Sequence, residues 1–373
     1  MKVRAAILWE QGHQPDEHGP LVVEEVDLDG PGPGELLVRI TAAGLCHSDL
    51  SAITGDRPRT MPAVIGHEAA GVVEELGPDV DGLAVGDQVV MVFVASCGQC
   101  AFCAAGRPNL CQSSWSARTA GTLQTGSRRL SIGGQSLHHY SGITAFAERA
   151  VVVPSSVVRI EPDVPPEVAA IFGCAVITGV GAVVNTARVP AGASVAVVGL
   201  GGVGLSALLG SIAAGAGRIV AVDTSPAKLE LARTLGATDV FDATDPSCAA
   251  AIVDALDGGV EFAFEMAGAA AAVELACAVT RRGGTTVTAG LAKPSERLSA
   301  QLSAMVADEK VLRGSYMGSC VPRRDIPRYV ELYRQGRLPV DRLRSATLAL
   351  DEINAGFARL AAGQSVRDVV VPK

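Results

Sequence analysis

The feature of this sequence that most constrains its fold is a glycine-rich turn between a buried strand and a helix. Residues 195–198 form a short apolar run, a G-x-G-x-x-G spacing follows at 199–204, and an apolar helical segment extends over 205–214. A second apolar strand ends in Asp223, nineteen residues after the last glycine of the turn. Strand, glycine turn, helix, strand and terminal acid together predict a Rossmann domain that binds a dinucleotide.

The chemistry of this turn also selects the cofactor. Glycines let backbone amides approach a pyrophosphate, and the N-terminus of the following helix stabilises its negative charge. Asp223 can accept a hydrogen bond from the adenosine ribose 2′-hydroxyl and would repel a 2′-phosphate, so the sequence predicts NAD rather than NADP. The residues expected to bind the cofactor in this region are Gly199, Gly201, Gly202, Val203, Gly204, Asp223 and Lys228.

The rest of the chain indicates a second domain of different architecture. The 373 residues are too many for one ordinary core, and a hydrophobic content of 48% with 42 glycines indicates a compact α/β protein rather than a disordered one. Residues 1–92 contain short alternating strands separated by glycine and proline turns, which predicts mostly antiparallel β structure. Strand and helix patterns alternate from Ala193 to about Gly314, which predicts a doubly wound parallel sheet.

Four clustered cysteines form the strongest local motif. Cys97, Cys100 and Cys103 are followed after seven residues by Cys111. Four thiolates at these spacings complete a tetrahedral zinc site with no open position, which is a structural site. The first three also resemble an iron–sulfur run, but there the fourth cysteine follows after three residues and precedes proline, whereas here the gap is seven and Gln112 follows. The sequence therefore favours zinc.

Net charge and cysteine usage restrict the partners and the compartment. A formal net charge of -8 disfavours binding to nucleic acid or to an anionic membrane, because both depend on clustered Lys and Arg. The N-terminal segment does not have the apolar pattern of a signal peptide, so we expect the nine cysteines to be reduced and the protein to be cytoplasmic. The uncharged runs 168–187 and 189–217 are long enough to span a membrane, but strand, glycine turn and helix explain the second run better.

One histidine and two isolated cysteines suggest an open metal site. His67 stands at a glycine-flanked bend that leads into a strand, Cys46 precedes it by about twenty residues, and Cys174 follows it by about a hundred. Each cysteine alone is more often a core residue than a ligand. If the fold brings the three side chains together, two thiolates and one imidazole make a zinc site with one open position. Cys174 and Thr178 are expected to share one face of a helix that opens at 165–167.

The order of these motifs resembles that of the zinc-dependent medium-chain alcohol dehydrogenases. The resemblance extends over essentially the whole chain and rests on the four-cysteine loop, the nucleotide fingerprint and the segments 44–50, 66–68 and 172–174. It implies a GroES-like, mostly β catalytic domain over 1–176, completed by 317–373, and a Rossmann NAD-binding domain over 177–316. It also implies a catalytic and a structural zinc ion, and reversible oxidation of an alcohol with hydride transfer to NAD.

The resemblance assigns roles to individual side chains. Cys46, His67 and Cys174 would hold the catalytic zinc, which is the ligand set known for alcohol dehydrogenases, and Zn²⁺ lowers the pKa of a bound hydroxyl from about 16 toward neutrality. Asp49 and Glu68 would orient or tune the metal site. The side chains assigned to the proton and the cofactor are Ser48, which would take the alcohol proton, His47 and Arg367 at the pyrophosphate, and Thr178 at the nicotinamide.

Two further features of the resemblance bear on turnover and on the substrate. Many members of the family carry a histidine where this chain has Ser51, a weak proton carrier, so we expect the proton relay to end in water.

The residues that match the family's substrate pocket are mostly large and apolar, which predicts a medium aliphatic or aromatic primary alcohol. These residues are Ser48, Phe93, Trp115, Tyr140 and Tyr316.

Two alternative functions stay open. Relatives that oxidise S-hydroxymethyl thiols use an arginine at the position of Trp115 to bind the substrate carboxylate, and a tryptophan cannot do this. A noncatalytic protein that binds NAD and zinc would lack a zinc ligand or Ser48, and all of them are present. The long segment after the four-cysteine loop resembles that of dimeric members, which predicts a homodimer.

Overall fold

The computed structural model describes residues 1–299 and 302–372 and divides into two compact units. The first unit comprises Met1–Cys174, Val321–Val330 and Arg344–Lys373, and the second comprises Ala175–Cys320 and Glu331–Leu343. The expected boundary at residue 176 lies close to this division. The segments 317–320 and 331–343 differ from the expectation, because they belong to the second unit, whereas Val321–Val330 and Arg344–Lys373 belong to the first.

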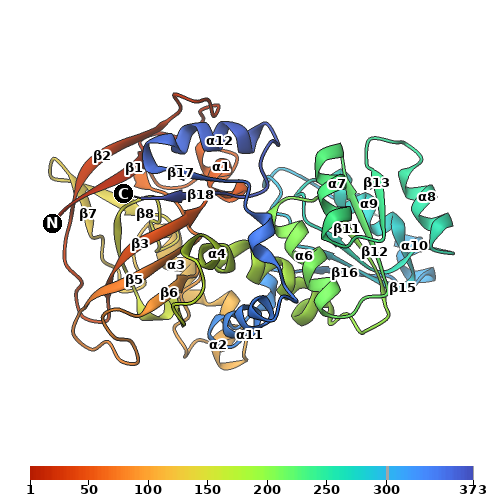
Figure 1. Cartoon of the computed structure of the whole chain (residues 1–373), viewed down its shortest axis with the longest axis horizontal. Helices are drawn as coiled ribbons and strands as arrows, with labels where there is room; N and C mark the ends of the chain where they lie inside the picture. Colours follow the sequence, from red (N-terminus) through yellow and green to blue (C-terminus); the bar gives the residue numbers. More distant parts are fainter. Residues whose placement is uncertain (300–301, 373) are drawn as a thin grey trace. The chain divides into compact units, whose positions relative to one another are not determined.

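The first unit is mostly antiparallel β structure (Figure 1). Its strands are β1 Lys2–Leu8, β2 Leu21–Leu28, β3 Leu36–Gly44, β4 Ala63–Val64, β5 Ala69–Leu76, β6 Gln88–Met91, β7 Leu130–Ile132, β8 Gln135–His139, β9 Arg149–Val152, β10 Val157–Ile160, β17 Ala346–Ala349 and β18 Asp368–Val371. One set closes into a barrel in the order β1-β2-β7-β8-β4. The other forms a seven-stranded sheet in the order β10-β6-β5-β3-β18-β17, with β9 paired to β3.

Short helices connect these strands. They are α1 His47–Ile53, α2 Ala101–Ala104, α3 Gln112–Ala120, α4 Pro166–Ile171 and α12 Ile353–Ala361, while α11 Pro322–Arg334 runs from the first unit into the second. Single turns of 3₁₀-helix lie at Pro108–Leu110, Pro154–Ser156 and Leu350–Glu352 in this unit, and at Met317–Ser319 and Val340–Leu343 in the second unit. Two clusters of buried apolar residues in this unit draw their members from both the sheet and the barrel.

The C-terminal strand ties the end of the chain to the centre of the sheet. β18 pairs antiparallel with β3, and Val369 lies opposite Gly44. This register places Asp368 beside Leu45, whose backbone amide donates to the Asp368 carbonyl at 2.9 Å. Arg367 is thereby brought next to the segment that follows β3, although it lies at the other end of the sequence.

The second unit is a doubly wound parallel sheet (Figure 1). Its elements are α5 Ile177–Gly181, β11 Ser194–Val198, α6 Gly202–Ala213, β12 Arg218–Asp223, α7 Pro226–Leu235, β13 Asp239–Asp242, α8 Cys248–Ala255, β14 Val260–Glu265, α9 Ala270–Val279, β15 Thr280–Thr288, α10 Leu302–Ala307 and β16 Val311–Gly314. The strand order β13-β12-β11-β14-β15-β16 is the Rossmann order, which reverses between β11 and β14. The fold class predicted from the glycine turn is confirmed.

A long apolar helix extends over Pro166–Ala187 and contains two π-helical turns, Phe172–Val176 and Ala182–Ala187. By length and by a mean hydropathy of 2.1 it could cross a membrane, but 89% of that window is buried, as in a core helix. Cys174 lies within the first π-helical turn and Thr178 lies on α5, which follows it, so the shared face expected from their four-residue spacing stays a prediction.

A glycine lets this helix approach β6 closely. A Cβ atom at Gly173 would collide with the carbonyl oxygen of Met91, the last residue of β6. Protein interiors are too closely packed to absorb such an overlap without moving the helix or the strand. Gly173 therefore allows the helix to lie close to β6, and this contact determines the position of the neighbouring Cys174.

Replacing this glycine should separate the helix from the sheet. We expect Gly173→Ala to lower the free energy of unfolding by about 1–3 kcal/mol, the usual cost of overpacking a close contact. Gly30→Ala is the matched control, because a Cβ atom there meets nothing within 4 Å, and it should change stability by less than about 0.5 kcal/mol. Urea unfolding measures both variants, and equal stabilities would contradict the packing argument.

Candidate functional site

Three side chains from distant segments meet inside the first unit. Cys46, His67 and Cys174 are buried, and their ligand atoms all lie within 4.8 Å of one another. Cys46 is the N-cap of α1 directly after β3, His67 precedes β5, and Cys174 lies on the π-helical turn. The structure thus brings together the three residues proposed from the sequence as ligands of an open zinc site.

The backbone and one carboxylate fix the orientation of the imidazole. Gly66 has φ of +97°, and a Cβ atom there would lie 2.8 Å from the backbone nitrogen of Phe146. Nδ1 of His67 bonds to Oδ1 of the buried Asp49 at 2.8 Å, which assigns the ring proton to Nδ1. Nε2 then offers its lone pair and stands 3.3 Å from Sγ of Cys174. A carboxylate on the far nitrogen is the usual way to orient an imidazole that binds metal.

The pKa values of these groups shift through their mutual contacts. A hydrogen bond from Cys174 outweighs burial and, with the Arg367 charge, holds the pKa of Cys46 well below its usual value. The same hydrogen bond, together with burial, raises the pKa of Cys174 well above its usual value. Burial lowers the pKa of His67, but the Asp49 carboxylate outweighs burial, so the net shift is well upward. The lowered pKa of Cys46 favours its thiolate, the form that binds zinc.

This donor set fits a tetrahedral zinc ion with one open position. Zinc binds sulfur at about 2.3 Å and imidazole nitrogen at about 2.0–2.1 Å, so neighbouring ligand atoms stand roughly 3–4 Å apart. The 3.3 Å between Sγ of Cys174 and Nε2 of His67 lies within this range. Thiolate and imidazole ligands suit zinc better than they suit magnesium or calcium.

A buried arginine pairs with the carboxylate of Glu68, the residue next to His67. Arg367 is 3% exposed, its Nη1 donates to the carbonyl of Leu45 at 2.7 Å, and the same atom lies 3.5 Å from Oε2 of Glu68. Burial raises the pKa of Glu68 to about 7, although the charge of Arg367 opposes this shift. The expectation that Arg367 contacts the cofactor pyrophosphate did not anticipate this pairing. Nothing local in the sequence links residues 68 and 367.

The first turn of α1 carries Ser48, which is predicted to take the alcohol proton, and His47, which is predicted to contact the cofactor pyrophosphate. His47 is exposed and Ser48 is half-buried. The hydroxyl of Tyr140 donates to the carbonyl oxygen of Ser48 at 3.0 Å, which fixes this turn. Oγ of Ser51 donates to the carbonyl oxygen of His47 at 2.9 Å, so its proton is committed to the helix backbone.

Two of the predicted pocket residues flank the imidazole. The ring of Phe93 meets that of His67 edge-on with centroids 5.5 Å apart, and the ring of Tyr140 is tilted at 6.0 Å. Trp115, which the family resemblance assigns to the pocket, is 65% exposed on α3, a helix that turns Ser114 inward. Tyr316 belongs to the second unit.

The sequence gives no motif for a further residue beside this aromatic pair. Cζ of Arg118, on α3, lies 5.6 Å from the centroid of the Phe93 ring, a cation–π contact. Arg118 lies three residues after Trp115 and so about one helical turn along the same helix. A spacing argument on the helix face, starting from the buried Ser114, would have found it at the i+4 position.

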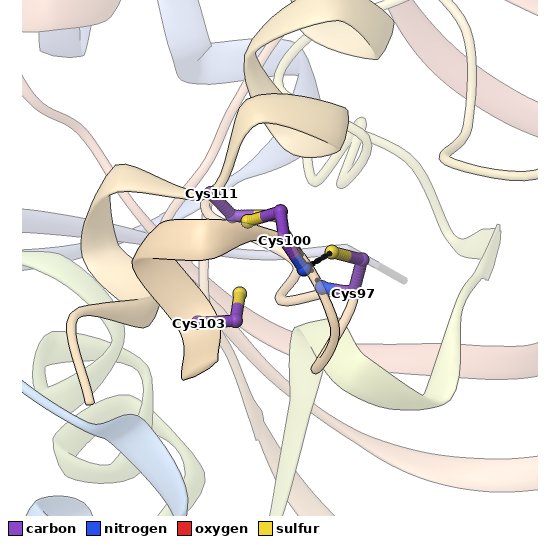
Figure 2. Close-up of side chains that lie close together, drawn as sticks. All are labelled: Cys97, Cys100, Cys103 and Cys111. Carbon is purple, nitrogen blue, oxygen red and sulfur yellow. Dashed lines mark hydrogen bonds between the residues drawn. The ribbon is translucent and has the colours of Figure 1, made fainter. Parts of the chain in front are cut away.

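The four clustered cysteines also converge, and Figure 2 shows their sulfur atoms facing one another. The backbone amide of Cys100 donates to Sγ of Cys97 at 3.4 Å, and that of Cys97 donates to Sγ of Cys111 at 3.3 Å. Backbone amides of Cys103 and Gln112 lower the pKa of Cys100 to about 6. Amide donors directed at sulfur favour thiolates, so this loop fits a closed zinc site with four sulfur ligands.

The glycine turn of the second unit is shaped to receive a phosphate group. Gly199 has φ of +92°, and a Cβ atom at Gly204 would collide with the Gly199 carbonyl oxygen. Gly201 faces open space, since a Cβ atom there meets nothing within 4 Å. Helix α6 begins at Gly202 with Val203 next, so free amides of its first turn point toward this space.

Asp223 ends β12 beside this turn. Its Oδ2 accepts a hydrogen bond from the amide of Leu200 at 2.6 Å, and its Oδ1 accepts one from the amide of Ser225 at 2.9 Å. A carboxylate has about four acceptor positions, so capacity remains for a ribose hydroxyl. Lys228 lies on α7 and Thr178 on α5, both in the same unit.

Comparisons with known proteins match most of the chain to dehydrogenases. Residues 32–166 match the model of the alcohol dehydrogenase GroES-like domain, and residues 202–335 match that of the zinc-binding dehydrogenases. The chain is 41% identical over 377 residues to putative alcohol dehydrogenase D of Mycobacterium tuberculosis (strain H37Rv), with 100% of both chains covered. It is 38% identical over 374 residues to S-(hydroxymethyl)glutathione dehydrogenase of Synechocystis sp., covering 99% of this chain and 100% of that protein. The crystal structure of benzyl alcohol dehydrogenase from Acinetobacter calcoaceticus is 31% identical, with a TM-score of 0.93 over 100% of both chains.

Asp49 should control zinc affinity at the open site only. We expect Asp49→Asn to weaken zinc binding there by about 10–100-fold, because the amide cannot support the imidazole as a carboxylate does. Competition with a chelator measures the loss, and the zinc held by the four clustered cysteines is the internal control in the same titration. Unchanged affinity in the variant would show that the Asp49–His67 bond does not serve the metal.

Proposed function

Because the chain belongs to the zinc-dependent medium-chain alcohol dehydrogenase family, we propose that it reversibly oxidises a medium aliphatic or aromatic primary alcohol to the aldehyde with NAD. The observation that supports this most is the buried convergence of Cys46, His67 and Cys174 around a position that can hold zinc. Three ligands leave the fourth position of the ion for a substrate oxygen. A closed site with four protein ligands would have indicated structure alone.

The groups around this position have different roles in the proposed reaction. Bound zinc supplies the Lewis acidity that lowers the pKa of the substrate hydroxyl, and bound NAD supplies the hydride acceptor. Asp49 holds the imidazole of His67 in one orientation and one tautomer. The rings of Phe93 and Tyr140 cover the imidazole and exclude water from it, which strengthens the electrostatic effects at the site.

The substrate proton leaves through the first turn of α1. Ser48 lies two residues after Cys46, and Tyr140 holds its carbonyl oxygen, which supports assigning its hydroxyl as the acceptor of the alcohol proton. The hydroxyl of Ser51 is already committed to the backbone. We therefore assign the end of the proton path to solvent water rather than to Ser51.

A base at position 51 should change the pH dependence of turnover. In Ser51→His, an imidazole that titrates near pH 6.5 would accept the proton, so the rise of kcat with pH should move to lower pH and turnover near neutrality should increase severalfold. Ser51→Asn is the control, since its side chain is polar but does not titrate. If the profile of Ser51→His matched that of the wild type from about pH 6 to 9, proton release would not limit turnover.

The cofactor and substrate proposals rest on different units. Asp223, held at the glycine turn by two backbone amides, favours the free ribose 2′-hydroxyl of NAD over the phosphate of NADP. Phe93 and Tyr140 offer apolar surface to an alkyl chain or aromatic ring.

An S-hydroxymethyl thiol is the alternative substrate, because the similar protein from Synechocystis is named as a dehydrogenase of S-(hydroxymethyl)glutathione. A noncatalytic role is disfavoured, since every predicted zinc ligand is present.

A substrate panel tests the proposed function. Initial rates of NAD reduction should be highest with benzyl alcohol and medium-chain primary alcohols, lower with S-hydroxymethylglutathione, and at least about tenfold lower in kcat/KM when NADP replaces NAD. Higher kcat/KM for S-hydroxymethylglutathione would select the thiol-dependent alternative. No turnover of any alcohol in a zinc-loaded preparation would contradict the enzyme assignment.

We also propose a cytoplasmic homodimer that associates through the second unit. All nine cysteines are free thiols, as a reducing compartment allows. β16 is an edge strand, and the preceding helix α10 leaves Leu302 76% and Val306 79% exposed. An open sheet edge beside apolar side chains favours pairing with a second copy.

Sedimentation velocity checks the assembly. The wild type should sediment with about twice the 38.1 kDa mass of one chain. The double variant Leu302→Glu, Val306→Glu should shift toward the monomer, because two buried charges at an interface are costly to desolvate. A wild-type monomer, or a double variant that still dimerises fully, would contradict this interface.

A further inference from the structure

A glutamate is buried where the strand order of the second unit reverses. Glu265 is the last residue of β14, pairs with Val198 at the end of β11, and is 0% exposed. In an open parallel sheet, a ligand binds outside the carboxyl ends of the strands at such a reversal. Glu265 therefore lies at the edge of the sheet that is expected to receive the dinucleotide.

The carboxylate of Glu265 joins the two turns that follow β14 and β15. Its Oε1 accepts a hydrogen bond from the backbone amide of Gly268. Its Oε2 accepts one from Oγ1 of Thr288, the last residue of β15, at 2.6 Å. The carbonyl oxygen of Glu265 also accepts a hydrogen bond from the amide of Ala289 at 2.9 Å. One residue thus fixes the chain after both strands.

Glycines bring these turns into close contact. A Cβ atom at Gly290 would lie 2.1 Å from the amide nitrogen of Gly268 and 2.7 Å from Oε1 of Glu265, so a larger residue does not fit there. The turn after β14 also borders the glycine-rich turn, because a Cβ atom at Gly199 would lie 2.7 Å from the backbone nitrogen of Ala267. The segments 199–204, 266–268 and 289–291 are therefore neighbours along one edge of the sheet.

The position of Asp223 assigns the two halves of the cofactor to opposite sides of the reversal. Asp223 ends β12 on one side of β11, whereas β14 and β15 lie on the other side. With the adenosine ribose at Asp223 and the pyrophosphate at the glycine-rich turn, the nicotinamide half extends toward β14 and β15. Leu291, which is 48% exposed, offers apolar surface on that side.

The burial of this carboxylate has a cost that an apolar side chain would avoid. A buried charged group lowers stability unless hydrogen bonds replace its contacts with water. An apolar residue at position 265 could not bind the amide of Gly268 and the hydroxyl of Thr288 together. Turns that are already held in place bind a ligand more tightly, because the free energy of ordering them is not lost on binding.

We propose that Glu265 is a positioning residue for the nicotinamide half of the cofactor. It holds the segments 266–268 and 289–291 in place before NAD binds and acts through these turns. The inference rests on the proposed use of NAD and is independent of the alcohol substrate.

Two ligands separate the halves of the cofactor. ADP-ribose contains every part of NADH except the nicotinamide ring, so the ratio of the two dissociation constants reports on the binding of that ring. We expect Glu265→Ala to weaken NADH binding on the order of 10-fold, the equivalent of one hydrogen bond to a charged group. Its affinity for ADP-ribose should change by less than about threefold. Isothermal titration calorimetry of the full chain measures both constants.

Three further variants locate the effect. Glu265→Gln should bind NADH within about threefold of the wild type, because its amide can accept from Gly268 and donate to Thr288. Thr288→Val removes one of the two contacts and should weaken NADH binding severalfold, again with little change for ADP-ribose.

Glu261→Ala is the matched control. Glu261 also joins neighbouring strands, since its carboxylate accepts from the amide of Ser194 at 2.8 Å and from Nη2 of Arg281 at 2.9 Å. It lies at the opposite end of β14, away from the edge that receives the dinucleotide. The ratio of the two dissociation constants in this variant should equal that of the wild type.

Equal losses for NADH and ADP-ribose in Glu265→Ala and Thr288→Val, or no loss for either ligand, would overturn the inference. A wild type that binds neither ligand would overturn it together with the choice of NAD. Alcohol turnover is a separate result. If the selective loss of NADH binding is observed but no alcohol is oxidised, the inference is supported and the proposed function is contradicted.

Discussion

The stability of the first unit depends on the neutralisation of several acidic groups that are buried around one metal site. Cys46 is 6% exposed, and both Asp49 and Glu68 are 0% exposed. Removing such charges from water costs several kcal/mol per ion unless each is paired. Asp49 is paired with His67, Glu68 with Arg367, and the remaining sulfur charge is what a divalent cation compensates. Burial nevertheless raises the pKa of both carboxyl groups, so the pairing with His67 and Arg367 offsets only part of the cost of removing these charges from water.

This compensation requires chain segments that are distant in sequence. The antiparallel pairing of β18 with β3 carries Arg367 to the residues beside Cys46, and the π-helical turn carries Cys174 to the same place. Gly173 allows that turn to approach β6, and Gly66 allows His67 to turn inward. The metal site is therefore a property of the whole first unit, whereas the four-cysteine loop is nearly self-contained.

The sequence predicts best what depends on local spacing. The glycine turn, Asp223 and the four clustered cysteines each lie within a short segment, so their spacing alone indicates the Rossmann sheet and the structural zinc loop. Cys46, His67 and Cys174 lie far apart in the sequence, so their residue types suggested a zinc site only on the condition that the fold brings them together, and the resemblance to a family assigned them as its ligands. The pairing of Arg367 with Glu68, the exposure of Trp115 and the place of Arg118 depend on strand register and on helix orientation, which spacing does not encode. The packing of 331–343 within the second unit depends likewise on tertiary contacts.

The most direct test of the account is the zinc content of the purified chain, measured by mass spectrometry together with alcohol-dependent reduction of NAD. The wild type should hold two zinc ions per chain and turn over, since two ligand clusters are present among the described residues. Cys174→Ser should hold one and should not turn over, because only the four-cysteine site stays intact. A wild type with a single zinc ion and no turnover, or a Cys174→Ser variant that keeps both zinc and activity, would contradict the assignment of Cys46, His67 and Cys174 as the reactive metal site.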